Sequence, residues 1–213
     1  CFNSSIQINK SISKGYELQT TRFVPASSVL VEVPSHIWEE YSSDFAAREI
    51  STVYQEFIPK FYSLSKEFNI SGNNLFKPLS LSYSIVKRIV HNNSISKKSS
   101  YLDFLLQSSF PNNKAAFPHI LLLDNSMLKY LEGTQSYHSI LKRKLFYSRI
   151  SSILFSNKIE SDLFLWAIGI ILSRGFSDHK ISLTLVPGID LVNHCSIPNA
   201  EHTYNESRKS FLL

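Results

Sequence analysis

The spacing of apolar residues changes twice along this chain, and that change limits the folds it can adopt. Residues 29–33 alternate with the period of a strand, as part of a strand-forming region over residues 15–34. From about residue 44 the apolar residues recur at helical spacing, and strand-like alternation returns over residues 181–185. This order predicts an α+β fold, in which the sheet of one domain is interrupted by a long helical insertion.

Turn and cap residues suggest where the individual elements begin and end. The turn residues 25–28 predict that the two halves of residues 15–34 form a hairpin or strand pair. Pro59 is expected to end the first helix, because proline removes a backbone donor and clashes with the preceding turn. The helices are expected over about 44–58, 82–91, 101–106, 124–131, 136–155 and 161–174, with Asp124 and Ser161 as N-caps.

The most apolar stretch is Leu163–Leu172. It is about half as long as the roughly 20 residues that a membrane span requires. We therefore interpret it as a buried core helix and expect no membrane partner.

Composition and charge narrow the class of protein. With 213 residues, 43% hydrophobic and 18% charged, the chain is typical of a folded protein with a buried core. The net charge is +5, but the basic residues are scattered and only residues 142–144 form a run, so no nucleic-acid partner is expected.

The two cysteines, Cys1 and Cys195, provide no disulfide framework and no CxxC zinc pair. This favours a reducing, intracellular compartment, with cytoplasm, nucleus and plastid left open. Because the first residue is cysteine rather than methionine, we expect the chain to be a piece of a longer product.

The densest functional signal lies in residues 185–200. After a turn at Pro187 and Gly188, the polar side chains of Asp190, Asn193 and His194 interrupt an apolar stretch. Buried polar groups need partners, so either a ligand or the local backbone must satisfy them.

Arg174 and Gly15 can likewise be interpreted either as ligand-binding positions or as ordinary structural residues. Arg174 ends the apolar helix, so its guanidinium lies either near the core or at the surface beside the helix C-terminus. Gly15 precedes a strand, where it allows a ligand to approach the backbone or simply marks a turn.

Together, four segments resemble SET-domain protein methyltransferases of the RuBisCO large-subunit lysine methyltransferase class, which also contains the actin-histidine methyltransferase. The stretches KGYEL (14–18), TTRFV (20–24) and VLVEVP (29–34) are together similar to the opening of SET domains, and YLEGT (130–134) to the family's "L-x-G-T" element. The helix bearing Trp166-Ala167 and SRGF (173–176) resembles "W-A … S-R-x-F", and LVPGIDLVNH (185–194) resembles "L-V-P-x-x-D-x-x-N-H".

The resemblance implies a β-rich SET core over residues 10–213. Its amino-terminal β part would span about 14–35, the helical insertion about 40–160, and the cofactor-site helix and strands about 161–213. It also implies an S-adenosyl-L-methionine-dependent protein N-methyltransferase whose partner is a protein substrate, lysine-directed, with histidine as the other target found in the class.

The same resemblance assigns roles to individual residues. The backbone at Gly15 and Tyr16 would face the methionine and sugar part of the cofactor, and Arg174 would hold its carboxylate end. Asn193 and His194 would contact it through backbone and amide groups, with the adenine near His194. These and Asp190, as a supporting or cofactor-facing residue, make the expected cofactor-binding set: Gly15, Tyr16, Arg174, Asp190, Asn193 and His194.

The sequence departs from the family pattern in two places. Glu17 stands where the family usually has a second glycine, which affects the amino-terminal cofactor contact. No "Y-G-F"-like segment follows Asn199, and Tyr204 comes too early to be the catalytic tyrosine. The resemblance therefore implies a member truncated at its carboxy-terminal end, with no catalytic residue in this chain. The alternative hypothesis is a non-catalytic protein-interaction fragment built on an incomplete SET domain.

Other chemistries find less support. His194 and Cys195 are sequence neighbours, whose side chains project in different directions, whereas a nucleophile and its base normally come from distant segments. The spacing of His179, His194, Cys195 and His202 matches no common zinc pattern, so no metal is expected. The oligomeric state stays open.

Overall fold

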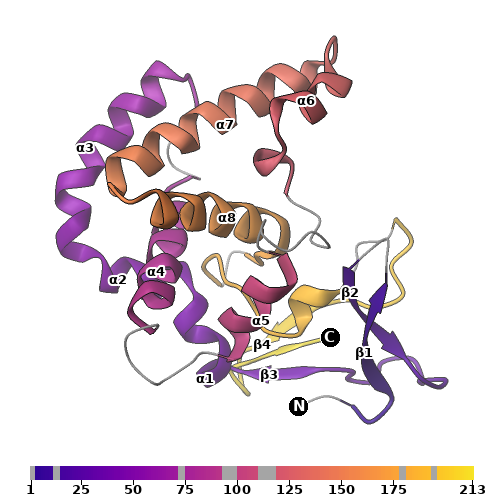
Figure 1. The fold of residues 1–213 in the computed structure, drawn as a ribbon. Coiled ribbons are helices and arrows are strands. Elements are labelled where there is room, and N and C mark those ends of the chain that lie inside the picture. Colours follow the sequence, from indigo (N-terminus) through magenta and orange to yellow (C-terminus); the bar gives the residue numbers. More distant parts are fainter. Residues whose placement is uncertain are drawn as a thin grey trace. The chain divides into compact units, whose positions relative to one another are not determined.

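The computed structural model describes residues 3–11, 15–71, 75–92, 100–109, 119–177, 181–192 and 196–213. The chain forms two compact units: Cys1–Ser42 together with Arg174–Leu213, and Ser43–Ser173. The described strands all belong to the first unit, whereas the second is helical (Figure 1). The expected α+β fold is therefore confirmed.

The strands of the first unit form two small antiparallel sheets. β1 (Ile6–Ser11) pairs with β2 (Gly15–Thr20), with Ile6 opposite Thr20 and Ser11 opposite Gly15. The second sheet has the order β3-β5-β4. Its strands are β3 (Glu32–Pro34), β4 (Thr203–Asn205) and β5 (Ser210–Leu212).

The predicted pairing within residues 15–34 is wrong. The turn is present, since Ser28 N donates to Pro25 O at 3.3 Å, but β2 pairs with β1 and β3 pairs with β5. The partner of β3 lies far along the chain, since Glu32 pairs with Leu212, 180 residues later. Short-range alternation contains no information about such a partner.

One hydrophobic cluster holds the first unit together. Trp38 packs edge-on against Phe211 and Tyr204, with ring centroids 5.1 and 6.0 Å apart. The buried members of this cluster are Val31, Val33, Trp38, Ile181, Val186, Ile189 and Phe211.

The strand expected over residues 181–186 is also not formed among the described residues. Thr184 makes only isolated bridges, to Phe176 and to Ser42. Thr184, Leu185 and Val186 are all fully buried, so the side chains do not alternate between two faces.

The second unit contains the long helices. Their bounds are α2 (Ser43–Glu49), α3 (Ser51–Glu67), α4 (Phe76–Asn92), α5 (Ser100–Ser109), α6 (Asn125–Leu128), α7 (Gln135–Leu154) and α8 (Lys158–Arg174). Short helical turns lie at η2 (Ile120–Leu122) and η3 (Lys129–Leu131) here, and at α1 (Ser35–Trp38), η1 (Glu39–Tyr41) and η4 (Ile189–Leu191) in the first unit.

Most of the expected helices are confirmed, although they begin and end at other residues than expected. Asp124 is the N-cap of α6, since its Oδ1 accepts from Met127 N at 2.9 Å. Residues 72–74 and 110–118 lie outside the described residues.

Two expected helix boundaries are wrong. Pro59 lies inside α3 on its exposed side, where the buried Phe57 and Phe61 hold the helix against its neighbours. Tertiary packing thus outweighs the local cost of proline. Ser161 is not a cap, because α8 begins at Lys158, and Asn157 Oδ1 accepts from Ile159 N at 2.8 Å.

α8 is the buried core helix that its apolar sequence predicts. Phe164 and Ile168 are fully buried, and the indole of Trp166 donates to Ser109 Oγ at 3.0 Å. Across the described ranges, no helix is both long and apolar enough to cross a membrane.

Gly169 allows α8 to approach His119 closely. A methyl group at position 169 would lie 2.8 Å from His119 Cβ and 3.2 Å from its Cγ. Because the Cβ atom is attached directly to the backbone, a change of side-chain rotamer would not remove this clash. Burial also lowers the pKa of His119, and its Nδ1 accepts from Leu121 N at 3.3 Å, which fixes the ring.

We therefore predict that Gly169→Ala lowers the free energy of unfolding by about 1–2 kcal/mol, because the clash exceeds the gain in helix propensity. The measurement is urea unfolding followed by tryptophan fluorescence, to which the buried Trp166 of the same helix contributes. Asp162→Ala, on the exposed side of the same helix, is the control and should change stability by less than about 0.5 kcal/mol. Stabilisation by Gly169→Ala would contradict the close approach.

Candidate functional site

The densest functional signal lies in residues 185–200, and the fold holds the described part around residues 184–192 in place. Thr184 exchanges two backbone hydrogen bonds with Phe176, at 2.8 and 2.9 Å. Leu185 N donates to Tyr41 O at 3.1 Å, and the side chains of Leu185 and Val186 are fully buried. The segment therefore enters the turn at Pro187 from a fixed direction.

The turn at Gly188 is confirmed and depends on glycine. Gly188 has φ +89° and ψ −42°, a conformation that side chains of L-residues disfavour. It begins η4, in which Asp190 N donates to Val186 O at 3.1 Å and Val192 N to Ile189 O at 3.0 Å. Ile189 and Leu191 are buried on either side of Asp190.

The carboxylate of Asp190 is held inside this turn. Its side chain has 0% exposure. One oxygen, Oδ1, accepts from Gly188 N at 2.9 Å, and the other, Oδ2, lies 3.6 Å from Arg174 Nη1. Two polar residues that the sequence singled out separately are thus brought together.

Arg174 is the last residue of α8. The sequence allowed its guanidinium to lie either near the core or at the surface, and the structure shows features of both. Its side chain is 25% exposed, yet the Nη1 atom is buried and has no hydrogen-bond acceptor within the described part of the chain. The attraction between the two charges at this separation is roughly 5 kcal/mol at an effective dielectric of about 20, before the cost of desolvation. The guanidinium is therefore held by charge, while Nη1 lacks a hydrogen bond.

The predicted amino-terminal contact lies on a neighbouring element. Gly15 and Tyr16 begin β2, which contacts η4, and Leu18 of β2 packs against the cluster that contains Ile189. The ring of half-buried Tyr16 lies 5.5 Å from Lys10 Nζ. β2, η4 and the last residue of α8 all belong to the first unit.

Glu17, which stands where the family usually has a second glycine, has a hydrogen-bond partner in its own strand. Glu17 Oε1 accepts from Gln19 Nε2 at 2.6 Å, one strand repeat along β2. Its carboxylate is thus engaged along its own strand face.

Asn193, His194 and Cys195 lie outside the described residues, as does His179. The cofactor roles of Asn193 and His194, like those of Gly15, Tyr16, Arg174 and Asp190, stay predictions. Among the residues that the structure describes, no three His, Cys, Asp or Glu side chains gather as metal ligands would.

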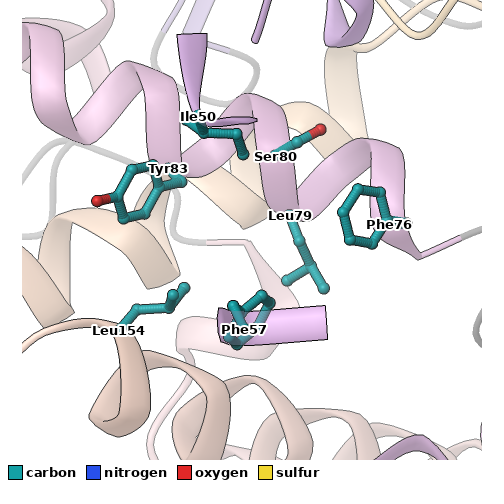
Figure 2. Close-up of a pocket in the computed structure, with 7 residues that line it drawn as sticks. All are labelled: Ile50, Phe57, Phe76, Leu79, Ser80, Tyr83 and Leu154. Atoms are coloured by element: carbon teal, nitrogen blue, oxygen red, sulfur yellow. The ribbon is translucent and has the colours of Figure 1, made fainter. Parts of the chain in front are cut away.

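The second unit contains a pocket that is lined mainly by apolar side chains (Figure 2). It holds about 280 Å³ of empty space, counted with its open side. Figure 2 shows the hydroxyl groups of Ser80 and Tyr83 directed away from its centre, and Ser80 Oγ donates to Lys77 O at 3.0 Å. The lining is otherwise apolar and consists of Ile50, Phe57, Phe76, Leu79 and Leu154. We interpret it as a packing gap between helices.

Sequence reasoning identified Asp190 and Arg174 but missed their pairing and the role of the Gly188 amide. One signal was available in Gly188-Ile189-Asp190, where an aspartate follows a turn glycine by two residues inside an apolar segment. Such an aspartate can accept a hydrogen bond from the turn backbone.

Two solved structures share this fold over 98% of the chain. One is the SET domain of LSMT bound to lysine and AdoHcy, with 20% sequence identity and a TM-score of 0.64. The other is Rubisco LSMT bound to AdoMet, with 22% identity and a TM-score of 0.66. The matches cover 45% and 44% of those chains, so this chain spans less than half the length of either.

No family model and no curated protein matches the chain. The likeness to the two solved structures establishes its fold, which is that of the SET-domain structures, as the sequence resemblance implied.

The burial of Asp190 gives a stability prediction. Asp190→Ala would leave Arg174 without its counter-charge and should lower the free energy of unfolding by about 3 kcal/mol. The measurement is urea unfolding followed by tryptophan fluorescence, to which Trp38 of the same unit contributes.

A matched control exists in the first unit. Arg208 Nη1 lies 3.6 Å from Glu32 Oε2, the same separation, but those side chains are 63% and 30% exposed. Arg208→Ala, which leaves the hydrogen bond from the buried Ser210 Oγ to Glu32 Oε1 in place, should cost about 1 kcal/mol or less. Equal losses in the two variants would show that burial of the Asp190 pair has no energetic weight.

Proposed function

We propose that this chain carries the cofactor-binding part of an S-adenosyl-L-methionine-dependent protein N-methyltransferase. Its fold is that of solved structures bound to AdoMet, or to lysine and AdoHcy. The observation that carries the proposal is the meeting of Arg174, Gly188 and Asp190 in one unit, because two separate motifs of the resemblance supply them.

The residues fit an anionic ligand group. The side chain of Arg174 is 25% exposed, and a guanidinium is a suitable partner for a ligand carboxylate. The adjacent strand carries Gly15 and Tyr16. We propose that Gly15, Tyr16 and Arg174 hold the cofactor together with Asn193 and His194, which follow η4 directly.

When bound, the cofactor supplies a methyl group on a positively charged sulfur. The protein contributes position, because in-line transfer to a nitrogen depends on the geometry of the two reactants. It must also favour the neutral amine, since a free lysine has a pKa of about 10.4. Desolvation of that amine favours its uncharged form.

We propose lysine rather than histidine as the target. Supporting this choice, one solved structure of the same fold contains lysine beside AdoHcy. The class resembled also contains a histidine enzyme, so the target residue is best identified by amino-acid analysis of the methylated product.

Binding tests the cofactor proposal directly. Calorimetry with S-adenosylhomocysteine should give binding by the 213-residue chain, and Arg174→Ala should weaken it by about tenfold or more, which corresponds to about 1.4 kcal/mol. Arg208→Ala, in the exposed pair of the same unit, should leave the affinity unchanged. A folded wild-type sample that does not bind at millimolar ligand would exclude cofactor recognition by this chain.

Methyl transfer separates the two functional hypotheses. Tritiated cofactor and a cell lysate should yield labelled lysine if this chain is a working enzyme. Binding without incorporation would instead support the non-catalytic interaction fragment as the role of this chain.

A further inference from the structure

The two oxygens of Asp190 join two parts of the site that the backbone does not connect locally. Oδ1 accepts from the amide of Gly188, and Oδ2 faces Arg174 Nη1 at 3.6 Å. Arg174 and Gly188 are separated by a chain segment that passes through Phe176 and Thr184. The carboxylate therefore links the helix end to the turn.

Burial distinguishes a positioning role from direct ligand contact. The Asp190 side chain has 0% exposure, whereas that of Arg174 has 25%. Ile189 and Leu191, on either side of Asp190, are buried and prevent η4 from turning the carboxylate outward. Arg174 thus has access to solvent, and Asp190 acts from behind it.

Arg174 needs such an anchor. An arginine side chain has several rotatable bonds, and holding its guanidinium in one place costs conformational entropy. Nη1 is buried without a hydrogen-bond acceptor among the described residues, and the charge of Asp190 at 3.6 Å restrains this atom. A rigid turn thus fixes a flexible side chain.

We propose that Asp190 is a positioning residue, which holds the guanidinium of Arg174 for the carboxylate end of the cofactor and ties it to the Gly188 turn. This inference rests on the proposed function. It replaces the cofactor-facing role for Asp190 with an indirect one, and it predicts that the effect of Asp190 on binding requires Arg174.

The first test needs no ligand. In the full chain, the Arg174 Nε–Hε group, assigned by its loss in Arg174→Lys, should be ordered in ¹⁵N relaxation measurements. Asp190→Asn keeps an oxygen for the Gly188 amide but removes the charge, and it should make the Arg174 group mobile. Unchanged order in Asp190→Asn would overturn the proposal whether or not the chain binds a cofactor.

The second test compares two ligands by calorimetry. S-adenosylhomocysteine carries the amino-acid carboxylate, and 5′-methylthioadenosine lacks it. Asp190→Asn should weaken the first by about tenfold and the second by less than about twofold. In an Arg174→Ala background, Asp190→Asn should have no further effect on the first.

Other outcomes are equally informative. Equal weakening of both ligands, or the same loss with and without Arg174, would show that Asp190 acts independently of Arg174 and would refute the positioning role. If the wild type binds neither ligand while Arg174 still loses order in Asp190→Asn, the proposed function fails, but the restraint on Arg174 stands.

Two further variants guard against a folding defect. Glu32→Gln, in the exposed pair with the same separation of 3.6 Å, should change neither ligand's affinity. Arg174→Lys keeps a positive charge beside Asp190, so it should fold even if Asp190→Asn does not. It should weaken S-adenosylhomocysteine by about tenfold and spare 5′-methylthioadenosine. Full affinity in Arg174→Lys would refute the need for a positioned guanidinium.

Discussion

The carboxylate of Asp190 is a buried negative charge in the first unit, and a buried charge must be compensated by nearby polar or positively charged groups. The turn at Gly188 provides one backbone donor, and the end of α8 provides the guanidinium of Arg174. The amide donates a hydrogen bond to Oδ1, and the guanidinium places a positive charge 3.6 Å from Oδ2. The local geometry of residues 186–191 therefore depends on where α8 ends.

Distant segments complete the same unit around this charge. β5 lies between β3 and β4, so the last described strand pairs with one from the first part of the chain. Phe211 of β5 packs against Trp38, and Ile189 joins the same cluster. Apolar packing of Ile189 and the ion pair of Asp190 with Arg174 thus both hold η4.

The proposed function uses the polar groups near η4, above all the guanidinium of Arg174. A SET-domain fold explains why β2, η4 and the last residue of α8 belong together, although sequence identity to the solved structures is only 20–22%. The chemistry asked of these residues is modest, because methyl transfer depends on position and on a neutral amine. A buried carboxylate that orders an arginine serves the first of these needs.

The sequence by itself determined the α+β class, most of the helices, the turn at Gly188 and the choice of Arg174 and Asp190 as candidate site residues. These features follow from local period, caps and turn chemistry, which act over a few residues. The tertiary structure decided the partner of β3, the passage of α3 through Pro59, the missing strand near Thr184 and the pairing of Arg174 with Asp190. Each of these depends on contacts between residues far apart in the chain, where packing and burial outweigh local preference.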